Sequence, residues 1–420
     1  MKVFKFGGAS VNTAERIRNL PGILNRYPGE KIMVIISAMG KTTNALEEVV
    51  RAFFSGQRDV ALQRFREVKE SHLAMARALL TGTLPGCETR LRDFFTEAEW
   101  LLHDRPVREY DYYYDQIVST GELYSTSIVS AFLDESGFPN QWLDVRDVFR
   151  TDDDFRDADI DWEITRANTE RLVRPLFMEN RLVLTQGFIG ATAENESTTL
   201  GREGSDYSAA VFANLLDAED LTIWKDVESV MNADPKQFSG AIPIPALNYN
   251  EVIEMAYYGA QIIHPKTIKP LQNKGIPMYV KSFLDPELPG TIIHDRPLVH
   301  LPPILVLKEN QVLLDCRSRD FEFIGEHHVG HLYKLMEGLH LKPNITQYGA
   351  IRFLCILDEW PEKIEKLASN ASGFVDIQVI KGLSLLTIRH YTREIFEELT
   401  AGKKILLRQQ TPDTIQLLLQ

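Results

Sequence analysis

Long apolar runs and paired cysteines are both scarce in this chain of 420 residues. No stretch approaches the run of about 18 apolar residues that crosses a bilayer, and none at the N-terminus has the length of a signal peptide. The three cysteines, Cys87, Cys316 and Cys355, have neither paired nor metal-type spacing. These absences argue against a membrane protein and a disulfide-stapled secreted domain, so we expect a soluble cytoplasmic protein.

The chain also has fewer basic than acidic residues, 46 against 59. The net charge of −13 argues against a broad nucleic-acid surface, which needs clustered lysine and arginine. A few local cations can still bind an anionic substrate. The hydrophobic content of 44% and charged content of 25% are typical of a globular protein. At this length we expect two or three domains.

Uninterrupted apolar strands alternate with helices in the first part of the chain. This pattern is typical of a mostly parallel sheet with helices on both faces. The asparagine–glutamate pair Asn12 and Glu15 predicts a helix start. The expected strands are Val3 to Phe6, Ile32 to Ser37, Arg181 to Gln186, Leu221 to Lys225 and Ile276 to Lys281. The expected helical regions are Ala45 to Trp100, Gln116 to Leu133 and Ser205 to Leu216.

The pattern changes at a proline-containing linker, His294 to Pro303, and we place the boundary between residues 1–297 and 298–420. Short strands and helices then follow in the strand–helix–strand–strand–helix–strand order of a ferredoxin-like α+β sandwich. A second such unit begins at Leu383 but lacks its final helix, and the strand Ile304 to Lys308 is expected to join it. The expected strands here are Gln311 to Cys316, Ile351 to Leu357, Val375 to Ile380, Leu383 to Ile388, Lys404 to Arg408 and Thr414 to Leu419.

A lysine and two glycines follow the first predicted strand. Lys5 would be costly to bury without a partner, while Gly7 and Gly8 let the backbone approach an anion closely. Strand, lysine, glycine pair and helix start together are typical of a phosphate site. An exposed lysine before a tight turn explains the same four residues equally well, so both interpretations stay open here.

A second cluster of polar residues precedes the helix expected at Ser205. A helix N-terminus attracts anions, and Arg202 beside it can clamp a carboxylate through two hydrogen bonds. Asp206 is either a simple capping residue or a group that orients Lys5 or a metal ion.

Three further motifs are weak when taken alone. Gly121 and Glu122 stand in a helix, where the glutamate could bind a substrate ammonium or be simply solvated. Lys225 and Asp226 end a strand, at the edge where open parallel sheets bind nucleotides. His327, His328 and His331 lack acidic or cysteine partners at matching spacing, so a surface role is favoured over zinc.

Taken in order, these motifs resemble the signatures of the aspartate kinases, which have the amino-acid kinase fold with C-terminal ACT domains. The resemblance covers about residues 1 to 295, and the tail resembles the family's paired ACT domains. The matching segments are Lys5 to Val11, Ser37 to Asn44, Gly121 to Leu123, Thr185 to Gly190, Thr199 to Arg202, Gly204 to Asp206, and Tyr258 to Pro265.

The resemblance implies an enzyme that uses ATP and Mg²⁺ to phosphorylate the side-chain carboxylate of L-aspartate, the first step toward lysine, threonine and methionine. Lys5 would contact the transferring phosphate, and Asp206 would organise Lys5; no protein ligand for a metal is assigned. Aspartate would be held by Thr43, Glu122, Arg202, Glu203, Gly204 and Ser205. The phosphates and ATP would be surrounded by Lys5, Phe6, Gly7, Gly8, Lys225, Asp226, Met231, Lys236, Gln261 and Ile262.

Several positions depart from the family pattern. Ala9 stands in place of a threonine, Glu203 in place of a common glycine, Lys225 in place of a threonine and Gln261 in place of a lysine. Two rivals stay open. One is another amino-acid kinase, for acetylglutamate or glutamate, although the long helical stretch and the ACT-like tail count against it. The other is a catalytically dead amino-acid-binding regulator, which the departures near ATP support. The apolar C-terminal strands further predict a homodimer formed through the tail.

Overall fold

The computed structural model describes residues 1–260, 262–298, 300–319 and 323–420. The described residues divide into two compact units. The first unit comprises residues 1–230, 243–253 and 262–298, and the second comprises residues 231–242, 254–260 and those described beyond 299. Within the described residues, no helix combines the length and the apolar content that crossing a membrane requires.

The first unit is built on an eight-stranded sheet in the order β3-β4-β2-β1-β7-β9-β10-β8. All neighbouring strands run parallel except β9 and β10, which confirms the mostly parallel sheet. The strands are β1 (Lys2–Phe6), β2 (Ile32–Ile36), β3 (Asn140–Leu143), β4 (Leu182–Gln186), β7 (Asp220–Lys225), β8 (Ala246–Asn248), β9 (Met278–Ser282) and β10 (Thr291–His294). A separate hairpin joins β5 (Ile189–Ala191) and β6 (Ser197–Thr199).

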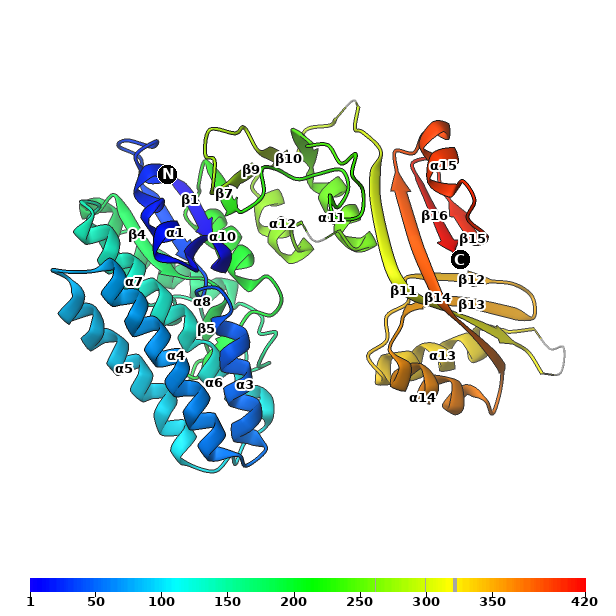
Figure 1. Cartoon of the computed structure of the whole chain (residues 1–420), viewed down its shortest axis with the longest axis horizontal. Helices are drawn as coiled ribbons and strands as arrows, with labels where there is room; N and C mark the ends of the chain where they lie inside the picture. The colour runs from blue at the N-terminus through cyan, green and yellow to red at the C-terminus, as the bar shows by residue number, and fades with distance from the viewer. Residues whose placement is uncertain (261, 299, 320–322) are drawn as a thin grey trace. The chain divides into compact units, whose positions relative to one another are not determined.

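Helices surround this sheet (Figure 1), and the long α3, α4 and α5 lie side by side. The α-helices up to the end of this region are α1 (Ala14–Arg18), α2 (Leu20–Leu24), α3 (Thr42–Phe54), α4 (Arg58–Leu79), α5 (Leu84–His103), α6 (Tyr110–Val118), α7 (Thr120–Glu135), α8 (Trp162–Asn168), α9 (Leu176–Glu179), α10 (Gly204–Leu215), α11 (Tyr249–Tyr258) and α12 (Pro265–Gln272). Shorter helical turns are η1 (Gly8–Val11), η2 (Val145–Asp147) and η3 (Thr169–Val173).

The centre of the first unit is an aromatic core. The side chain of Phe6 stacks on Trp224 with ring centroids 6.1 Å apart, and it meets Phe283 edge to face. Every residue of α10 is buried, because this helix packs against β1, β2 and β7. A helix buried on all sides is positioned rigidly by its neighbours, which matters because its first turn carries predicted site residues.

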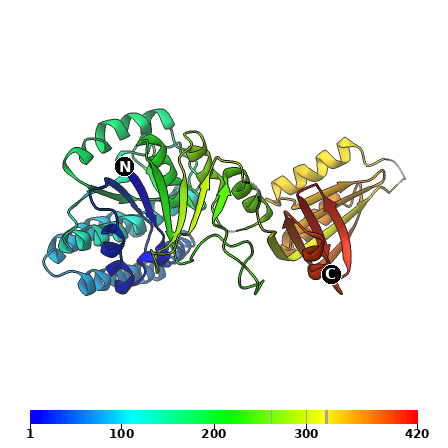
Figure 2. The ribbon, with the colours of Figure 1, turned by 90° about the horizontal axis from the view of Figure 1, so that it is seen from above.

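The second unit is a six-stranded sheet in the order β12-β13-β11-β14-β16-β15. Figure 2 shows α13 lying along this sheet. The apolar faces of α13 and α14 form one core with β11 and β13, while α15 packs beside β14 and β16. The elements are β11 (Ile304–Arg317), α13 (Glu326–Gly338), β12 (Ile345–Tyr348), β13 (Arg352–Asp358), α14 (Pro361–Ala371), β14 (Asp376–Arg389), α15 (Arg393–Thr400), β15 (Ile405–Gln410) and β16 (Thr414–Leu419).

Two strands of this unit are longer than the sequence pattern predicts. β11 and β14 each run for 14 residues and pair antiparallel along their lengths, with a bulge between Lys308 and Leu313. The strands expected separately on either side of these irregularities are therefore continuous. The prediction that Ile304 to Lys308 joins the second half is confirmed, since this segment pairs with Leu385 to Arg389.

Two other local predictions were wrong. Thr13 rather than Asn12 caps the first helix, because its hydroxyl accepts the backbone N–H of Arg16. The single helix predicted from Gln116 is two helices that meet at Ser119, and the tyrosine-rich segment before it forms α6. The aromatic side chains explain this extension, because Tyr113 of α6 packs edge to face on Phe53.

The buried helix α10 generates a stability prediction. Phe212 is fully buried and stacks on Phe149 with centroids 4.6 Å apart. Phe212→Ala should lower the free energy of unfolding by about 3–5 kcal/mol, because it removes a large side chain from a closed core. Urea denaturation of the full chain measures this loss. Trp100 is 74% exposed, so Trp100→Ala should change the same quantity by less than about 0.5 kcal/mol. Equal losses in the two variants would contradict the packing described.

Candidate active site

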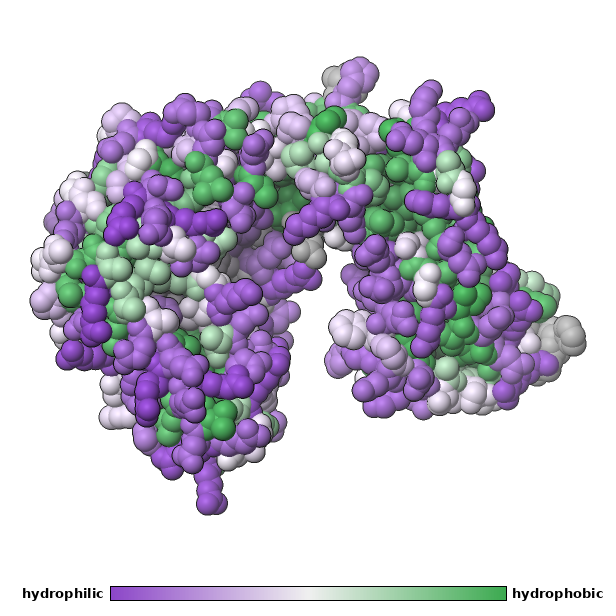
Figure 3. Space-filling view, in the orientation of Figure 1, coloured by the Kyte–Doolittle hydropathy of each residue, from purple (hydrophilic) through white to green (hydrophobic). Residues whose placement is uncertain are grey.

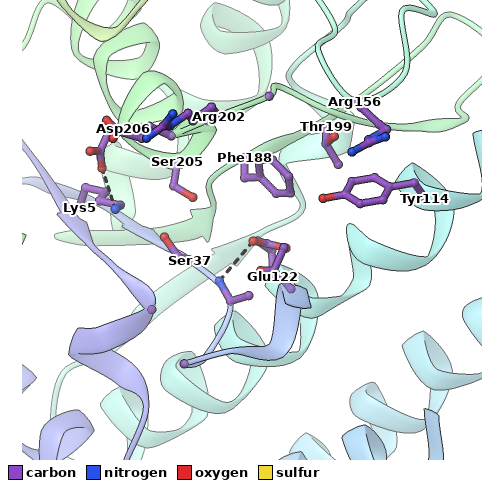
Figure 4. A pocket seen from close by; sticks show the side chains of 17 residues that line it. Lys5, Ser37, Tyr114, Glu122, Arg156, Phe188, Thr199, Arg202, Ser205 and Asp206 are labelled. Atoms are coloured by element: carbon purple, nitrogen blue, oxygen red, sulfur yellow. Dashed lines mark hydrogen bonds and ion pairs between the residues drawn. The ribbon is translucent and has the colours of Figure 1, made fainter. Parts of the chain in front are cut away.

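A cavity of about 440 Å³ opens in the first unit at the carboxyl ends of the parallel strands. Figure 4 shows the side chains that line it. They include the predicted residues Lys5, Gly8, Thr43, Glu122, Arg202, Glu203, Gly204, Ser205 and Asp206. The fold thus brings together residues from β1, α3, α7 and α10 that are up to about 200 positions apart. This edge of a parallel sheet is where α/β proteins bind ligands.

Lys5 and Asp206 form a buried ion pair at one end of the cavity. The Lys5 Nζ lies 2.6 Å from the Asp206 Oδ1, and both side chains are at most 10% exposed. Burial alone would raise the pKa of Asp206, but the ammonium groups of Lys5 and Lys225 outweigh it and hold the pKa below its ordinary value. Asp206 is therefore ionised at neutral pH and paired with Lys5, which is the arrangement expected of a group that orients the lysine.

The glycine pair after β1 lets two loops approach each other. A Cβ on Gly8 would lie 2.6 Å from the carbonyl oxygen of Ala38, which leaves no room for a larger residue. A Cβ on Gly7 would lie 3.4 Å from the Lys5 Nζ. Phe6 differs from its neighbours, because its side chain lies in the aromatic core and only its backbone is near the site.

The start of α10 presents Arg202 and Glu203 to the cavity. Glu203 has φ +55, the left-handed conformation that glycine adopts most easily. Its Oε2 accepts the backbone N–H of His264 at 2.8 Å, and the residue lines the cavity. Arg202 is exposed and makes no ion pair within the part of the chain that the structure describes. Its guanidinium is thus available to a carboxylate ligand.

Glu122 is a buried side chain whose carboxyl group can form a further hydrogen bond or ion pair. The side chain is 2% exposed, and its Oε1 accepts the backbone N–H of Ala38 at 3.3 Å. Its Oε2 has no hydrogen-bond partner among the described residues. Burial raises the pKa of Glu122 to about 8. A cationic ligand group at this oxygen would stabilise the ionised form, as an ammonium does.

The lining residues that the sequence analysis did not assign include Tyr114, Arg156, Phe188 and Thr199. Phe188 and Thr199 lie inside family-like segments, so a signal for them existed. Tyr114 and Arg156 lie outside those segments and give no such signal.

A buried carboxylate holds part of this second group in place. Asp115 accepts the backbone N–H groups of Arg156 at 3.0 Å and Thr199 at 2.7 Å, and also the Thr199 hydroxyl at 2.7 Å. Burial raises the pKa of Asp115 to about 7, although these three bonds oppose the shift. Asp115 therefore fixes the wall of the cavity that is formed by Arg156 and Thr199.

The structure gives contacts for only some of the residues predicted to bind ATP. The Lys225 Nζ donates to the carbonyl oxygen of Ile262 at 2.6 Å and lies 3.9 Å from the Asp206 Oδ2. Asp226 is exposed at the end of β7. Met231 and Lys236 belong to the second unit, and Gln261 lies outside the described residues. The contacts of these last three with a nucleotide stay predictions.

The residues that line the cavity fit a metal ion that is bound mainly by the phosphates of the nucleotide. No group of three or more histidine, cysteine, aspartate or glutamate side chains gathers among the described residues. Mg²⁺ at phosphate sites keeps several waters and uses few carboxylates, so a metal bound mainly by the nucleotide needs no such group. In the histidine cluster, His331 stacks on Phe374 with centroids 4.6 Å apart, which is a packing role.

The profile of the amino acid kinase family matches residues 1–282. The chain belongs to this family. Curated relatives within it include aspartokinases, which agrees with the resemblance seen in the sequence. Aspartokinase 2 of Arabidopsis thaliana, a chloroplastic protein, is 31% identical over 407 residues, covering 92% of this chain and 73% of the relative. A bifunctional aspartokinase/homoserine dehydrogenase of Zea mays is 33% identical over 299 residues, covering 70% of this chain but only 32% of the relative.

Solved aspartokinase structures have the same fold over the whole chain. Aspartokinase III of E. coli in complex with lysine and aspartate superposes with a TM-score of 0.84 at 25% identity, covering 100% of this chain and 95% of that one. Its complex with aspartate and ADP gives a TM-score of 0.80 at 26% identity, with 100% and 96% covered. These similarities confirm the expected fold class and the identification of the chain as a kinase of this family.

Glu122 generates a prediction about stability and pH in the ligand-free protein. Its pKa of about 8 lies above the ordinary value of 4.5, so the folded state holds a proton that the unfolded state has lost. The free energy of unfolding should therefore fall as the pH rises through this window. Glu122→Gln cannot ionise and removes this contribution. The melting temperature of the wild type relative to the variant should fall between about pH 5 and pH 8.

Comparing the two proteins removes the contribution of Asp115, whose raised pKa acts in the same direction in both. A difference in melting temperature that stays constant across this range would contradict the buried state of Glu122.

Proposed function

We propose that this protein transfers the γ-phosphoryl group of ATP to the side-chain carboxylate of L-aspartate, giving 4-phospho-L-aspartate in the first step toward lysine, threonine and methionine. The observation that carries this proposal is a single cavity with a buried lysine at one end and an unsatisfied buried carboxylate, Glu122, further along. Similarity to aspartokinases over nearly the whole chain supports it.

The chemistry of the acceptor decides what the protein must supply. A carboxylate with a pKa near ~4 is already ionised at neutral pH, so no general base is required. The difficulty is that an anion attacks an anionic phosphate. Positioning and neutralisation of charge therefore carry catalysis, through Lys5 and the backbone N–H groups at the start of α10.

Asp206 has a positioning role in this scheme. Its low pKa makes it a poor proton acceptor, and its ion pair with Lys5 fixes the ammonium at the end of β1. Mg²⁺, held mainly by phosphate oxygens and water, would supply further neutralisation when bound. Gly7 and Gly8 would line the same site with their backbone groups.

The aspartate side of the cavity is assigned by charge. Glu122 would bind the α-ammonium group, and Arg202 would bind the α-carboxylate with two hydrogen bonds. Thr43, Glu203, Gly204 and Ser205 would complete the contacts, with Glu203 held by its hydrogen bond to the backbone of His264. On the nucleotide side we propose Lys225, Asp226, Ile262, Met231, Lys236 and Gln261, together with the backbone of Phe6.

We propose residues 1–297 as the catalytic domain and 298–420 as a paired ACT-like region. The three free, buried cysteines support a reducing compartment. The Arabidopsis relatives are chloroplastic, so a cytoplasmic location stays a prediction.

A comparison of acceptors tests the reaction. Purified protein is incubated with ATP, Mg²⁺ and either L-aspartate, L-glutamate or N-acetylglutamate, and acyl phosphate is trapped with hydroxylamine. We expect product with aspartate alone. Preferential use of either glutamate compound would favour the rival amino-acid kinases, and no product with any acceptor would favour the catalytically dead regulator.

Lys5 generates the mechanistic prediction. Lys5→Ala should reduce kcat by roughly 100-fold or more, because one preorganised charge at the transferring group is worth a few kcal/mol. The KM for aspartate should change much less. Lys2→Ala is a matched control, because Lys2 lies on the same strand and pairs with Asp220 away from the cavity. Turnover of Lys5→Ala close to that of the control would remove Lys5 from the mechanism.

The second unit generates a prediction about assembly. Its sheet ends in two strands, β12 and β15, that have a neighbour on one side only among the described residues. Apolar residues of the same sheet, including Leu354, Ile380 and Leu406, are only partly buried, and Figure 3 shows apolar side chains at the surface of this unit. Open strand edges and apolar sheet surface are usually covered by a partner. Sedimentation should reveal a homodimer at micromolar concentration, and a monomer there would refute it.

A further inference from the structure

A buried histidine on α4 lies outside the cavity but contacts the loop that forms one of its walls. His72 is 3% exposed and is not among the residues that line the cavity. Burial lowers the pKa of His72, so its imidazole is neutral at neutral pH. A neutral imidazole has one nitrogen that donates a hydrogen bond and one that accepts. The partners of the two nitrogens therefore show what this side chain holds in place.

The contacts of the ring decide which nitrogen carries the hydrogen. Nδ1 lies 2.8 Å from the carbonyl oxygen of Val68, one turn earlier on the same helix. A carbonyl oxygen can only accept, so Nδ1 donates and Nε2 is the acceptor. Nε2 lies 3.3 Å from the hydroxyl oxygen of Thr42. The Thr42 hydroxyl also lies 2.7 Å from the carbonyl oxygen of Met39, so its one hydrogen is shared between two acceptors.

Thr42 links His72 to the loop after β2. It is the first residue of α3, and the next residue, Thr43, lines the cavity. The loop before it, residues 37–41, contributes three more residues to the same wall. The position of this wall therefore depends on how Thr42 is held.

The same threonine also packs against α7. A Cβ at Gly121 would lie 3.0 Å from the Cγ2 of Thr42, so a larger residue would require one of the two helices to shift. Glu122 follows Gly121, and its Oε1 accepts the backbone N–H of Ala38 at 3.3 Å, as a dashed line marks in Figure 4. The loop and α7 are thus joined at two points, one of which is Thr42.

Aromatic neighbours keep the imidazole in place. The His72 ring meets Tyr124 edge to face with centroids 5.3 Å apart, and Tyr124 meets Phe95 in the same way at 4.7 Å. These three rings come from α4, α7 and α5, and each is at most 3% exposed. Side chains in a close-packed interior have little freedom to move. Nε2 is therefore a fixed acceptor for the Thr42 hydroxyl.

We propose that His72 is a positioning residue for the acceptor: through the Thr42 hydroxyl it holds the start of α3, and with it Thr43, against the helix that carries Glu122. This inference rests on the proposed function, in which Thr43 and Glu122 contact L-aspartate. His72 itself touches no reacting atom. Loss of its bond to Thr42 should therefore weaken the binding of aspartate more than that of ATP.

Two amide substitutions separate the roles of the two nitrogens. The amide group of glutamine reaches as far as Nε2, whereas that of asparagine reaches only as far as Nδ1. His72→Asn should raise the KM for aspartate about three- to tenfold, the factor that one neutral hydrogen bond is worth. His72→Gln should stay closer to the wild type, because its amide oxygen can accept the Thr42 hydroxyl. His72→Phe keeps a ring without nitrogens and should resemble His72→Asn. The KM for ATP should stay near that of the wild type in all three.

A side chain that only filled space would give a different order. His72→Phe would then be the mildest change, and His72→Gln and His72→Asn would be equally harmful, with both KM values following the melting temperature. That result would overturn the proposal. Phe95→Leu controls for general loosening, because Phe95 contacts Tyr124 on α7 and belongs to α5. It should lower the melting temperature and leave the KM for aspartate unchanged.

Thr42→Val tests the same bond from its other end. Valine keeps the shape of the side chain but has no hydroxyl group. If the bond carries the effect, adding His72→Phe to Thr42→Val should raise the KM for aspartate no further. Effects of the two changes that multiply would show that the residues act independently, and the proposal would be wrong.

Calorimetric titration with L-aspartate separates this inference from the proposed function. If the wild type phosphorylates aspartate and His72→Asn keeps the wild-type KM, only the inference about His72 fails. If the wild type binds aspartate without turnover, the proposed function fails, and the dissociation constants of the variants replace KM as the test. If the wild type neither binds nor phosphorylates aspartate, both fail.

Discussion

The ion pair between Lys5 and Asp206 is the constraint on which the site depends. A lysine and an aspartate with little exposure would each be costly to bury alone, so each requires the other. Lys5 ends the central strand β1, and Asp206 stands in the first turn of the buried helix α10. The ion pair therefore holds the N-terminus of α10 next to the carboxyl end of β1. The loops after β1 and β2 and the start of α7 line the cavity beside this ion pair.

Glu203 shows how a departure from the family pattern is accommodated. The resemblance implies a common glycine there, and the positive φ at this position explains that preference. The glutamate accepts the conformational cost and gains a hydrogen bond to the backbone of His264, at the start of α12. Arg156 and Phe188 are further non-glycine residues with positive φ at the same cavity. Three such residues in one site indicate that backbone strain is tolerated around the cavity.

Much of the fold follows from local patterns in the sequence. The continuous apolar segments of β1, β2 and β7 predicted a parallel sheet, and the sequence motifs predicted that Lys5, Glu122, Arg202 and Asp206 act together. What could not be predicted depends on contacts distant in the sequence. In the sequence, nothing distinguishes Asp115 from an ordinary aspartate on a helix. Its role follows only from the fold, which places Thr199 and Arg156 beside it.

The lengths of β11 and β14 could not be predicted either, because the polar residues near Lys308 and Lys381 are typical of turns. The structure instead places these irregularities inside the continuous β11 and β14. Side-chain pattern alone cannot distinguish a bulge within a strand from a short loop between two strands.

The uninterrupted course of β11 and β14 has a mechanical consequence for the second unit. Each half contributes its own helices, α13 and α14 in one and α15 in the other, yet both halves share the same two central strands. Neither half can be excised or exchanged without cutting a strand that the other half uses. We therefore expect the two halves to unfold together rather than as separate cooperative units.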